Sequence, residues 1–525
     1  MRILTTVAGI TAALLAAGSA TAQEPQHGGQ LVVGVVQGDP DTFDCHATRS
    51  IGSLYRLAPH YSTLLRYSSV NYPAIEGDVA DSWEVSADGL VYTFHIRPGV
   101  VFHDGSSLDA HDVEASLNRV RNPPAGVVSA RQAQFSAVAS IEATDDQTVV
   151  VQLSHPDSAM LDILAGPFNC IYSAELLESD ADYPARRVMG SGPFVFSDYQ
   201  AGASWTGTRF DGYYDPGKPY LDSVQLLNMA MPAAVNAMAA GQIGTIVPSL
   251  SQADVDRIAQ MQGDNVVAYP AIDTTVFFNA IMNTQRAPFD DVRVRRALNL
   301  AIDRRAGAAA LSRTTSASGY GGWMRPGSEW ERPQAELEQL PGFNPDIEAA
   351  RAEARALLAE AGQENLSFTY LNWNRYTPMG VFLIDQWRQI GVTVTQETLD
   401  VGEFFGRQNR GDFDVTLIAI AEYSDDPTLR FSSMLSHSQN PRNLTFADDP
   451  AFDALFQAQA IETDPAARRD LALQIENEIM DQSLYIPLFW SVRPMVVRAD
   501  VHGFEVPNIA SNYVGLDFGS VWLSQ

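Results

Sequence analysis

The residues best suited to binding chemistry stand together in one stretch, Leu371–Pro378, which reads LNWNRYTP and contains Trp373, Asn374, Arg375 and Tyr376. A guanidinium group binds a carboxylate through two parallel hydrogen bonds, and an indole ring packs against an apolar or planar group. The stretch follows a predicted strand and precedes a predicted helix, and such loops face the ligand crevice in open α/β sheets. The pattern predicts a ligand-binding cluster, with a surface arginine beside a core tryptophan as the alternative.

Other candidates are spread along the first half of the chain. His46 and Arg49 come after the first predicted strand and the segment Asp39–Asp44, from which both side chains can reach a cleft. Trp205 in GASWTG and Phe168 in GPFNC add large aromatic side chains. Because large aromatic residues are more often buried in a core, that is the alternative for both.

Motifs of covalent and metal-assisted catalysis are missing from the sequence. It contains no G-x-S-x-G, H-E-x-x-H or G-x-x-x-x-G-K-[ST] pattern. The nine histidines are scattered, and His103 and His111 are too far apart for a metal-ligand pair. The missing motifs predict no catalytic, cofactor or metal site, with an exported hydrolase as the alternative, because a catalytic triad forms in space and leaves no motif.

The balance of charges limits the class of partner. The 525 residues include 34 Lys and Arg against 63 Asp and Glu, which gives a net charge of −29. Such a field repels phosphate backbones and anionic membrane surfaces, so we expect no nucleic-acid partner. Hydrophobic residues make up 46% and charged residues 18%, which excludes a disordered chain. The length suggests two to four domains at roughly 150 residues each.

The N-terminus has the pattern of a secretory signal peptide. Arg2 precedes an apolar run, Ile3–Ala17, and small residues lead to Ala20–Ala22, which fits a cleavage site before Gln23. The run is shorter than the roughly 20 residues that span a bilayer. We expect a soluble mature chain in the periplasm. In that oxidising compartment Cys45 and Cys170 can form a disulfide, with two buried free thiols as the alternative.

The elements that must position these residues alternate between strands and helices, which is typical of an α/β fold. Apolar runs and alternating patterns predict strands over Leu31–Val36, Thr148–Leu153, Leu221–Met229, Leu366–Leu371, Val392–Thr398 and Asp414–Ala421, with a hairpin over Ser82–Ile96. Helical periodicity predicts helices over Asp109–Val120, Ala159–Ala165, Ala233–Ala240, Asp290–Ile302, Ile347–Ala361, Val381–Ile390 and Pro465–Met480, with Asp109 and Asp290 as N-caps.

Two longer extended segments, Val266–Ala280 and Leu484–Val497, flank the predicted α/β units of the second half. If both cross between two bodies, the chain leaves a first lobe, builds a second one and returns. This is the connectivity of a two-lobed clamp with a two-strand hinge, although two ordinary core strands have the same pattern.

Six stretches in order along the chain resemble the extracellular solute-binding family 5, the peptide- and nickel-type binding proteins of ABC importers. The first, Gly77–Val120, reads GDVADSWEVSADGLVYTFHIRPGVVFHDGSSLDAHDVEASLNRV. The others are Met189–Tyr220, Asn279–Arg305, Ala349–Gly362, Asp385–Val394 and Tyr485–Val497. Each stretch is weak alone, but six in the family's order are specific.

The resemblance implies a two-lobed periplasmic-binding-protein fold of type II, similar to cluster C, with an extra subdomain in the N-terminal lobe. The expected segments are a signal peptide (1–22), lobe I (23–60, 185–272 and 488–525), its extra subdomain (61–184) and lobe II (273–487). A ligand is expected between the lobes, and the closed form is expected to be recognised by a permease with its ATPase subunits. The expected protein is a monomer.

The resemblance also implies site residues. Peptide-binding members hold the ligand's ammonium group with an aspartate just before a proline. In the matching stretch, Ala421–Pro427, that position is filled by Tyr423, or by Glu422 if one residue is inserted, and Asp425 is the other nearby acid. An exposed acidic loop is the alternative.

The family also places aromatic residues where Trp490 stands, near the hinge. Arg493 follows as a further candidate, with an interdomain salt bridge as the alternative. A short peptide or similar polar molecule is the expected ligand. Oligosaccharides, opines and nickel chelates are the alternatives in the same fold, and an exported hydrolase or a chaperone-like protein is the alternative of another class.

Overall fold

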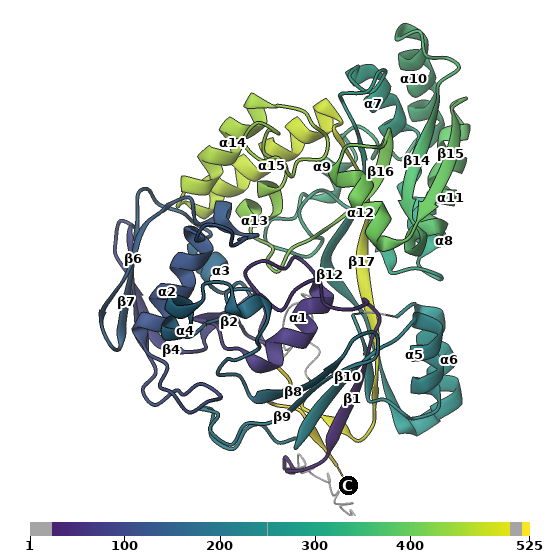
Figure 1. Ribbon diagram of the computed structural model, residues 1–525. Coiled ribbons are helices and arrows are strands. Elements are labelled where there is room, and N and C mark those ends of the chain that lie inside the picture. Colours follow the sequence, from purple (N-terminus) through teal and green to yellow (C-terminus); the bar gives the residue numbers. More distant parts are fainter. Residues whose placement is uncertain (1–23, 249, 505–516, 525) are drawn as a thin grey trace, which may run out of the picture.

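Two lobes joined by a pair of long strands make up the protein (Figure 1). The computed structural model describes residues 24–248, 250–504 and 517–524, so the predicted signal peptide lies outside the described residues. Lobe I contains β1 (Gln30–Val35), and lobe II contains β14 (Ser367–Trp373). The joining strands are β12 (Val266–Met282) and β17 (Tyr485–Arg498).

One 11-stranded sheet passes through both lobes in the order β15-β14-β16-β12-β17-β11-β1-β10-β9-β8, with β13 attached to β17. Its other strands are β8 (Phe194–Gln200), β9 (Ser204–Arg209), β10 (Ser223–Asn228), β11 (Thr245–Val247), β13 (Ala317–Gly319), β15 (Thr393–Leu399) and β16 (Val415–Ala421).

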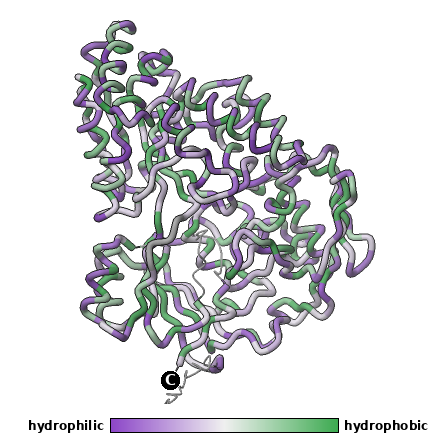
Figure 2. Tube along the Cα trace, turned by 180° about the vertical axis from the view of Figure 1, so that it is seen from behind, coloured by the Kyte–Doolittle hydropathy of each residue, from purple (hydrophilic) through white to green (hydrophobic). Residues whose placement is uncertain are grey.

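The antiparallel pairing of β12 with β17 continues from one lobe into the other. Val267 pairs with Val497 in lobe I, and Phe278 pairs with Phe489 in lobe II, with register shifts between. The two extended segments expected from the sequence are therefore the connecting strands of a two-lobed fold, as predicted. Seen from behind in Figure 2, the two strands run as neighbours, and hydrophobic and hydrophilic positions alternate along the outer helices.

In lobe I the sheet is covered on both faces, which explains the continuous apolar run of β1. Val33 and Val35 are fully buried in the core that α1 (Ile51–Leu57) shares, whereas Val32 packs on the opposite side. That side is closed by α5 (Met231–Ala239) and α6 (Gln252–Gln262), which pack in a separate cluster. A strand buried on both faces has no alternating pattern.

A four-stranded antiparallel sheet, β4-β5-β7-β6, forms a subdomain at the side of lobe I (Figure 1). The predicted hairpin is confirmed, with its turn before Gly89. Asp109 caps α2 as predicted, and Asp112 completes a capping box. The elements here are β2 (Leu65–Tyr67), β3 (Ile75–Gly77), β4 (Ala80–Val85), β5 (Val91–Ile96), α2 (Ala110–Arg121), β6 (Val138–Asp145), β7 (Thr148–Leu153), α3 (Met160–Leu164) and α4 (Ala174–Ser179).

Lobe II packs helices around β14, β15 and β16. They are α7 (Val292–Leu300), α8 (Arg304–Leu311), α9 (Gln334–Leu337), α10 (Ile347–Glu360), α11 (Thr377–Arg388), α12 (Val401–Asn409), α13 (Pro427–Ser432), α14 (Pro450–Ile461) and α15 (Pro465–Gln482). The short strands β18 (Val501–His502) and β19 (Trp522–Leu523) pair near the C-terminus. Among the described residues, no helix is both long and apolar enough to cross a membrane.

Two predicted helix starts in lobe II are wrong. The helix expected from Asp290 begins at Val292, because a turn places Asp291 rather than Asp290 at the N-cap. The helix expected from Val381 begins at Thr377, since Pro378 stands in the first turn, where a missing N–H costs nothing. The exact residue bounds of the predicted lobes remain a prediction.

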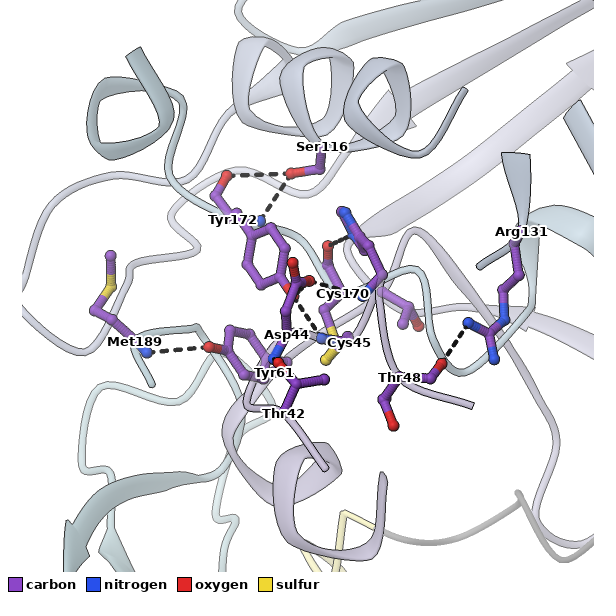
Figure 3. The surroundings of a disulfide bond; sticks show 12 residues. Thr42, Asp44, Cys45, Thr48, Tyr61, Ser116, Arg131, Cys170, Tyr172 and Met189 are labelled. Atoms are coloured by element: carbon purple, nitrogen blue, oxygen red, sulfur yellow. Dashed lines mark hydrogen bonds between the residues drawn. A yellow bond between two sulfur atoms is a disulfide. The ribbon is translucent and has the colours of Figure 1, made fainter. Parts of the chain in front are cut away.

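Cys45 and Cys170 form a disulfide, as one of the two alternatives predicted, with their Cα atoms 6.0 Å apart (Figure 3). The backbone N–H of Cys45 donates to the Tyr172 hydroxyl, which donates to Asp44. The bridge therefore ties the segment after β1 to the loop before α4.

Candidate functional site

Polar side chains from both lobes meet at what we call the interlobe boundary. Ser424 of lobe II donates to Asp162 of lobe I at 2.6 Å, and Asp162 also accepts from Tyr67 at 2.6 Å. Further contacts across the boundary include Tyr72 to the Tyr423 carbonyl (3.4 Å), Tyr423 to Gln134 (3.3 Å), Arg442 to the Ala130 carbonyl (3.3 Å), and Ser158, whose N–H donates to the Ala460 carbonyl (3.0 Å) and whose hydroxyl donates to the Glu462 carbonyl (2.5 Å). The lobes are therefore closed on each other.

Tyr423, one of the predicted site residues, inserts into the core of lobe I. Its side chain is 3% exposed, and its ring lies 6.3 Å from that of Tyr67. A phenol at this position carries no charge near neutral pH, because burial raises its pKa further. Tyr423 thus connects the lobes but cannot act as a carboxylate anchor.

Asp425, the second predicted acid, is already paired. Both of its oxygens accept from the Arg325 guanidinium, at 2.7–3.0 Å, and the two side chains are buried together. The neighbouring Asp426 caps α13 and pairs with Arg468 at 2.8 Å. A role for Asp425 as a ligand anchor remains a prediction that this pairing does not favour.

Glu422 lies among arginines at the boundary. Arg430, Arg442 and Arg131 all lie near enough to stabilise its charged form, yet burial outweighs them and raises its pKa to about 7. The hydroxyl of Thr275 donates to its backbone carbonyl. Asp425, the other acid predicted from the sequence, has an ion pair with an arginine. Glu422 lies near three arginines, but no direct ion pair joins it to them in the described residues.

Arg430 has a setting that the sequence did not reveal. Its side chain is fully buried, and it donates to the Thr275 carbonyl at 2.9 Å while its guanidinium lies 5.0 Å from the ring centre of Trp490. Within the described chain, its Nε and Nη1 have no hydrogen-bond partner. The residue stands in the short helix α13, where neither periodicity nor a motif pointed to it.

The four residues predicted as a cluster do lie together, at the end of β14 in lobe II. Arg375 lies 5.7 Å from the Trp373 ring and 6.0 Å from the Tyr376 ring, and Asn374 donates to Asp400 at 2.7 Å. In the described structure their hydrogen bonds and ring contacts are all with lobe II. Contact with a ligand remains a prediction for this cluster.

Trp490 and Arg493 lie on β17 and are both buried. Trp490 stacks on Phe277, with ring centres 4.4 Å apart, and donates to the Gly322 carbonyl at 3.2 Å. Arg493 is 5% exposed, and its Nε has no partner in the described part of the chain. Trp490 is therefore a core residue of lobe II that also supports Arg430.

Two candidates in lobe I have structural roles. His46 lies between Asp44, Arg119 and the Cys170 carbonyl, and burial lowers its pKa to about 4, so it is neutral. Trp205 is fully buried and donates to His60 at 2.8 Å, away from the contacts of the interlobe boundary. These surroundings do not favour the predicted ligand contacts, because no face of either ring is left open.

Arg49 and Phe168, the remaining candidates, lie near the boundary. Partial desolvation and, to a smaller extent, the charge of Arg442 lower the pKa of Arg49 to about 10. Arg49 of lobe I and Arg442 of lobe II therefore lie close enough to influence each other. Arg131 stacks over Phe168 at 3.4 Å and donates to the Thr48 carbonyl at 2.8 Å.

A separate cavity of about 120 Å³ is lined by lobe I residues alone. Its charged side chains are paired with one another, as Arg66 with Asp78 at 3.4 Å and Lys218 with Asp215 at 2.9 Å. Because these charges have partners, this cavity offers less to a charged ligand than the interlobe boundary does.

Comparison with known proteins agrees with this two-lobed arrangement. The model of the bacterial extracellular solute-binding proteins, family 5 middle region, matches residues 74–442. The chain belongs to solute-binding family 5. It is 30% identical over 534 residues to di/tripeptide-binding protein 4 of Pseudomonas aeruginosa strain UCBPP-PA14, covering 95% of this chain and 96% of that protein.

Other members of solute-binding family 5 align over nearly the whole chain. The dipeptide-binding protein of Escherichia coli strain K12 is 26% identical over 514 residues, covering 91% of this chain and 92% of that protein. The structure of AgaA from A. tumefacien R10 in complex with agropinic acid has a TM-score of 0.83 and 26% identity, covering 95% of this chain and 99% of that one. The fold of this family 5 chain is therefore shared with proteins whose named ligands differ.

The unusual position of Glu422 leads to a prediction about pH. Its raised pKa means that the folded protein binds this proton more tightly than the unfolded chain, so the carboxylate destabilises the fold increasingly as the pH rises from about 5 to 8. We expect Glu422→Gln to raise the melting temperature most at pH 8, by a smaller amount at pH 5.5, and hardly at all at pH 4, below the ordinary carboxyl pKa of 4.5.

The prediction concerns the difference in melting temperature between the variant and the wild type at each pH. Burial lowers the pKa of His46 and His60, which titrate in the opposite sense and are common to both proteins. Differential scanning calorimetry at several pH values gives the difference directly, and Glu84→Gln, at an exposed position on β4, is the control. A Glu422→Gln difference that does not change with pH would contradict the prediction.

Proposed function

We propose that this chain is the periplasmic solute-binding component of an ABC importer. It captures a short peptide, or a polar small molecule of similar size, between the lobes and delivers it to a membrane permease with ATPase subunits. The supporting observation is the interlobe boundary, where two lobes joined by two strands meet over polar side chains and leave guanidinium nitrogens of Arg430 without protein partners. A ligand enclosed there supplies acceptors and so favours the closed form.

The named ligands of the relatives support a ligand of the size of a short peptide. Two of them are named for dipeptides or tripeptides, and AgaA was solved with agropinic acid. A binder of a solute other than a peptide is the second candidate, which the tyrosine at position 423 favours over a ligand held by its ammonium group. In either case the protein acts as an exported monomer without catalytic activity.

Native mass spectrometry of the protein purified from its own periplasm tests this proposal. Molecules released on denaturation are then identified. A mixed set of short peptides supports a peptide importer, whereas a single non-peptide mass supports a dedicated carrier. A protein that releases nothing and whose melting temperature is unchanged by any member of a panel of peptides, opines and sugars contradicts the proposed function.

A further inference from the structure

We propose that the ligand is bound through a carboxylate that accepts hydrogen bonds from Arg430, and that binding does not require a free ammonium group. This rests on the proposed function, because it assumes a ligand between the lobes. It narrows that function to a class of anionic solutes, which includes acidic peptides blocked at the amino end.

The first argument is the state of the Arg430 guanidinium. It is fully buried, with one nitrogen bound to the Thr275 carbonyl and two nitrogens without partners in the described structure. A buried charged donor left without an acceptor is costly, so such groups are normally paired. Glu422 and Asp425 lie close enough to favour the charged form of Arg430, but neither accepts a hydrogen bond from it.

The second argument is that Arg430 lies close to a side chain of the other lobe. Tyr72 of lobe I is close enough for the charge of Arg430 to offset part of the rise in its pKa that burial causes. Tyr72 in turn donates to the Tyr423 carbonyl across the boundary. The proposed ligand position is therefore the boundary between Tyr72 and the free donors of Arg430, while Trp490 packs against the guanidinium from lobe II.

The third argument is the balance of charge at the boundary. Arg430, Arg442 and Arg131 lie near Glu422, whose pKa of about 7 leaves it only partly charged near neutral pH. Asp162, another carboxyl group at the boundary, already accepts hydrogen bonds from Ser424 and Tyr67. Asp425 forms an ion pair with Arg325, and Asp426 forms one with Arg468. In a chain with a net charge of −29, a local excess of positive charge marks the place where an anion is stabilised.

The fourth argument is the lack of a site for an ammonium group. Tyr423 is a buried phenol without a negative charge, and Asp425 is neutralised by Arg325. Glu422 is surrounded by arginines, which would repel a ligand cation at the same place. No carboxylate among these three residues is therefore available to an ammonium group.

Calorimetric titration with three matched probes tests the proposal. They are L-Ala-L-Glu, its N-acetyl form, and L-Ala-L-Gln amide, which keeps the ammonium group but has no carboxylate. We expect the acetylated probe to bind within about 3-fold of the free dipeptide, and the amide to bind at least about 30-fold more weakly, as the loss of a charged hydrogen-bonded group implies.

Variants test whether Arg430 is the residue that binds the carboxylate. Arg430→Gln is expected to weaken binding of the acetylated probe about 30-fold, and Arg442→Gln, at an exposed position, about 5-fold. Arg313→Gln, at an exposed position after α8, is the control. If Arg430→Gln fails to fold by circular dichroism, Arg442→Gln and the three probes still decide the matter.

The outcomes separate this proposal from the proposed function. Equal binding of the amide and the acid, or loss of binding on acetylation, overturns the carboxylate proposal but leaves a peptide carrier. Failure of all three probes to bind at millimolar concentration also overturns it, while the solute released in native mass spectrometry decides the function independently.

Discussion

Replacement of Trp490 by alanine is expected to lower the free energy of unfolding by about 3–5 kcal/mol. The side chain is 2% exposed, stacks on Phe277 and donates to the Gly322 carbonyl. Its removal leaves a cavity in the core of lobe II and withdraws the ring that packs against Arg430. Urea denaturation followed by circular dichroism measures the loss as a lower midpoint at unchanged slope.

A matched substitution at the surface shows that burial is the cause. Phe405→Ala removes another large aromatic ring of lobe II, but this ring is 47% exposed, so we expect a cost below about 1 kcal/mol. If Trp490→Ala weakens ligand binding while stability is unchanged, the ring contacts ligand directly, as the sequence alone suggested. A large loss of stability shows instead that its role is to build the core.

The architecture was predictable because its signals are local. Apolar runs such as Leu31–Val36 and the long extended segments that became β12 and β17 are defined by residue types over short distances. Side-chain caps are local as well, which is why Asp109 could be predicted. Asp290 was mistaken for Asp291 because either carboxylate can cap a helix, and only the turn before α7 decides between them.

The site was harder to predict because it depends on contacts between residues that are distant in the sequence. Arg430 stands in a helix of six residues, and its importance comes from Thr275 and Trp490, which are distant in sequence. Similarly, the sequence offered Asp425 as a free acid, and only the fold brings Arg325, 100 residues away, into contact with it. Residue types can suggest a charged site, but pairing determines which charges remain for a ligand.

Loss of the Cys45–Cys170 disulfide is expected to lower the free energy of unfolding by about 2–5 kcal/mol, since it closes a loop of 125 residues that is otherwise free in the unfolded chain. The double variant Cys45→Ala/Cys170→Ala avoids mixed disulfides and leaves small apolar side chains at two buried positions. Urea denaturation of the variant and of the wild type measures the difference. Equal midpoints at equal slopes would contradict this expectation.

The same variant also tests whether lobe I must be rigid for binding. The bridge joins the segment that carries Asp44 and Arg49 to the loop of Phe168, over which Arg131 stacks. Without it, the lobe I side of the interlobe boundary gains conformational freedom that ligand binding must remove, so we expect affinity to fall about 3- to 10-fold. Calorimetric titration with N-acetyl-L-Ala-L-Glu, without urea and at a temperature where both proteins are folded, separates the effect on affinity from the effect on stability. Unchanged affinity together with reduced stability would mean that the bridge supports the fold of lobe I but does not preorganise the boundary.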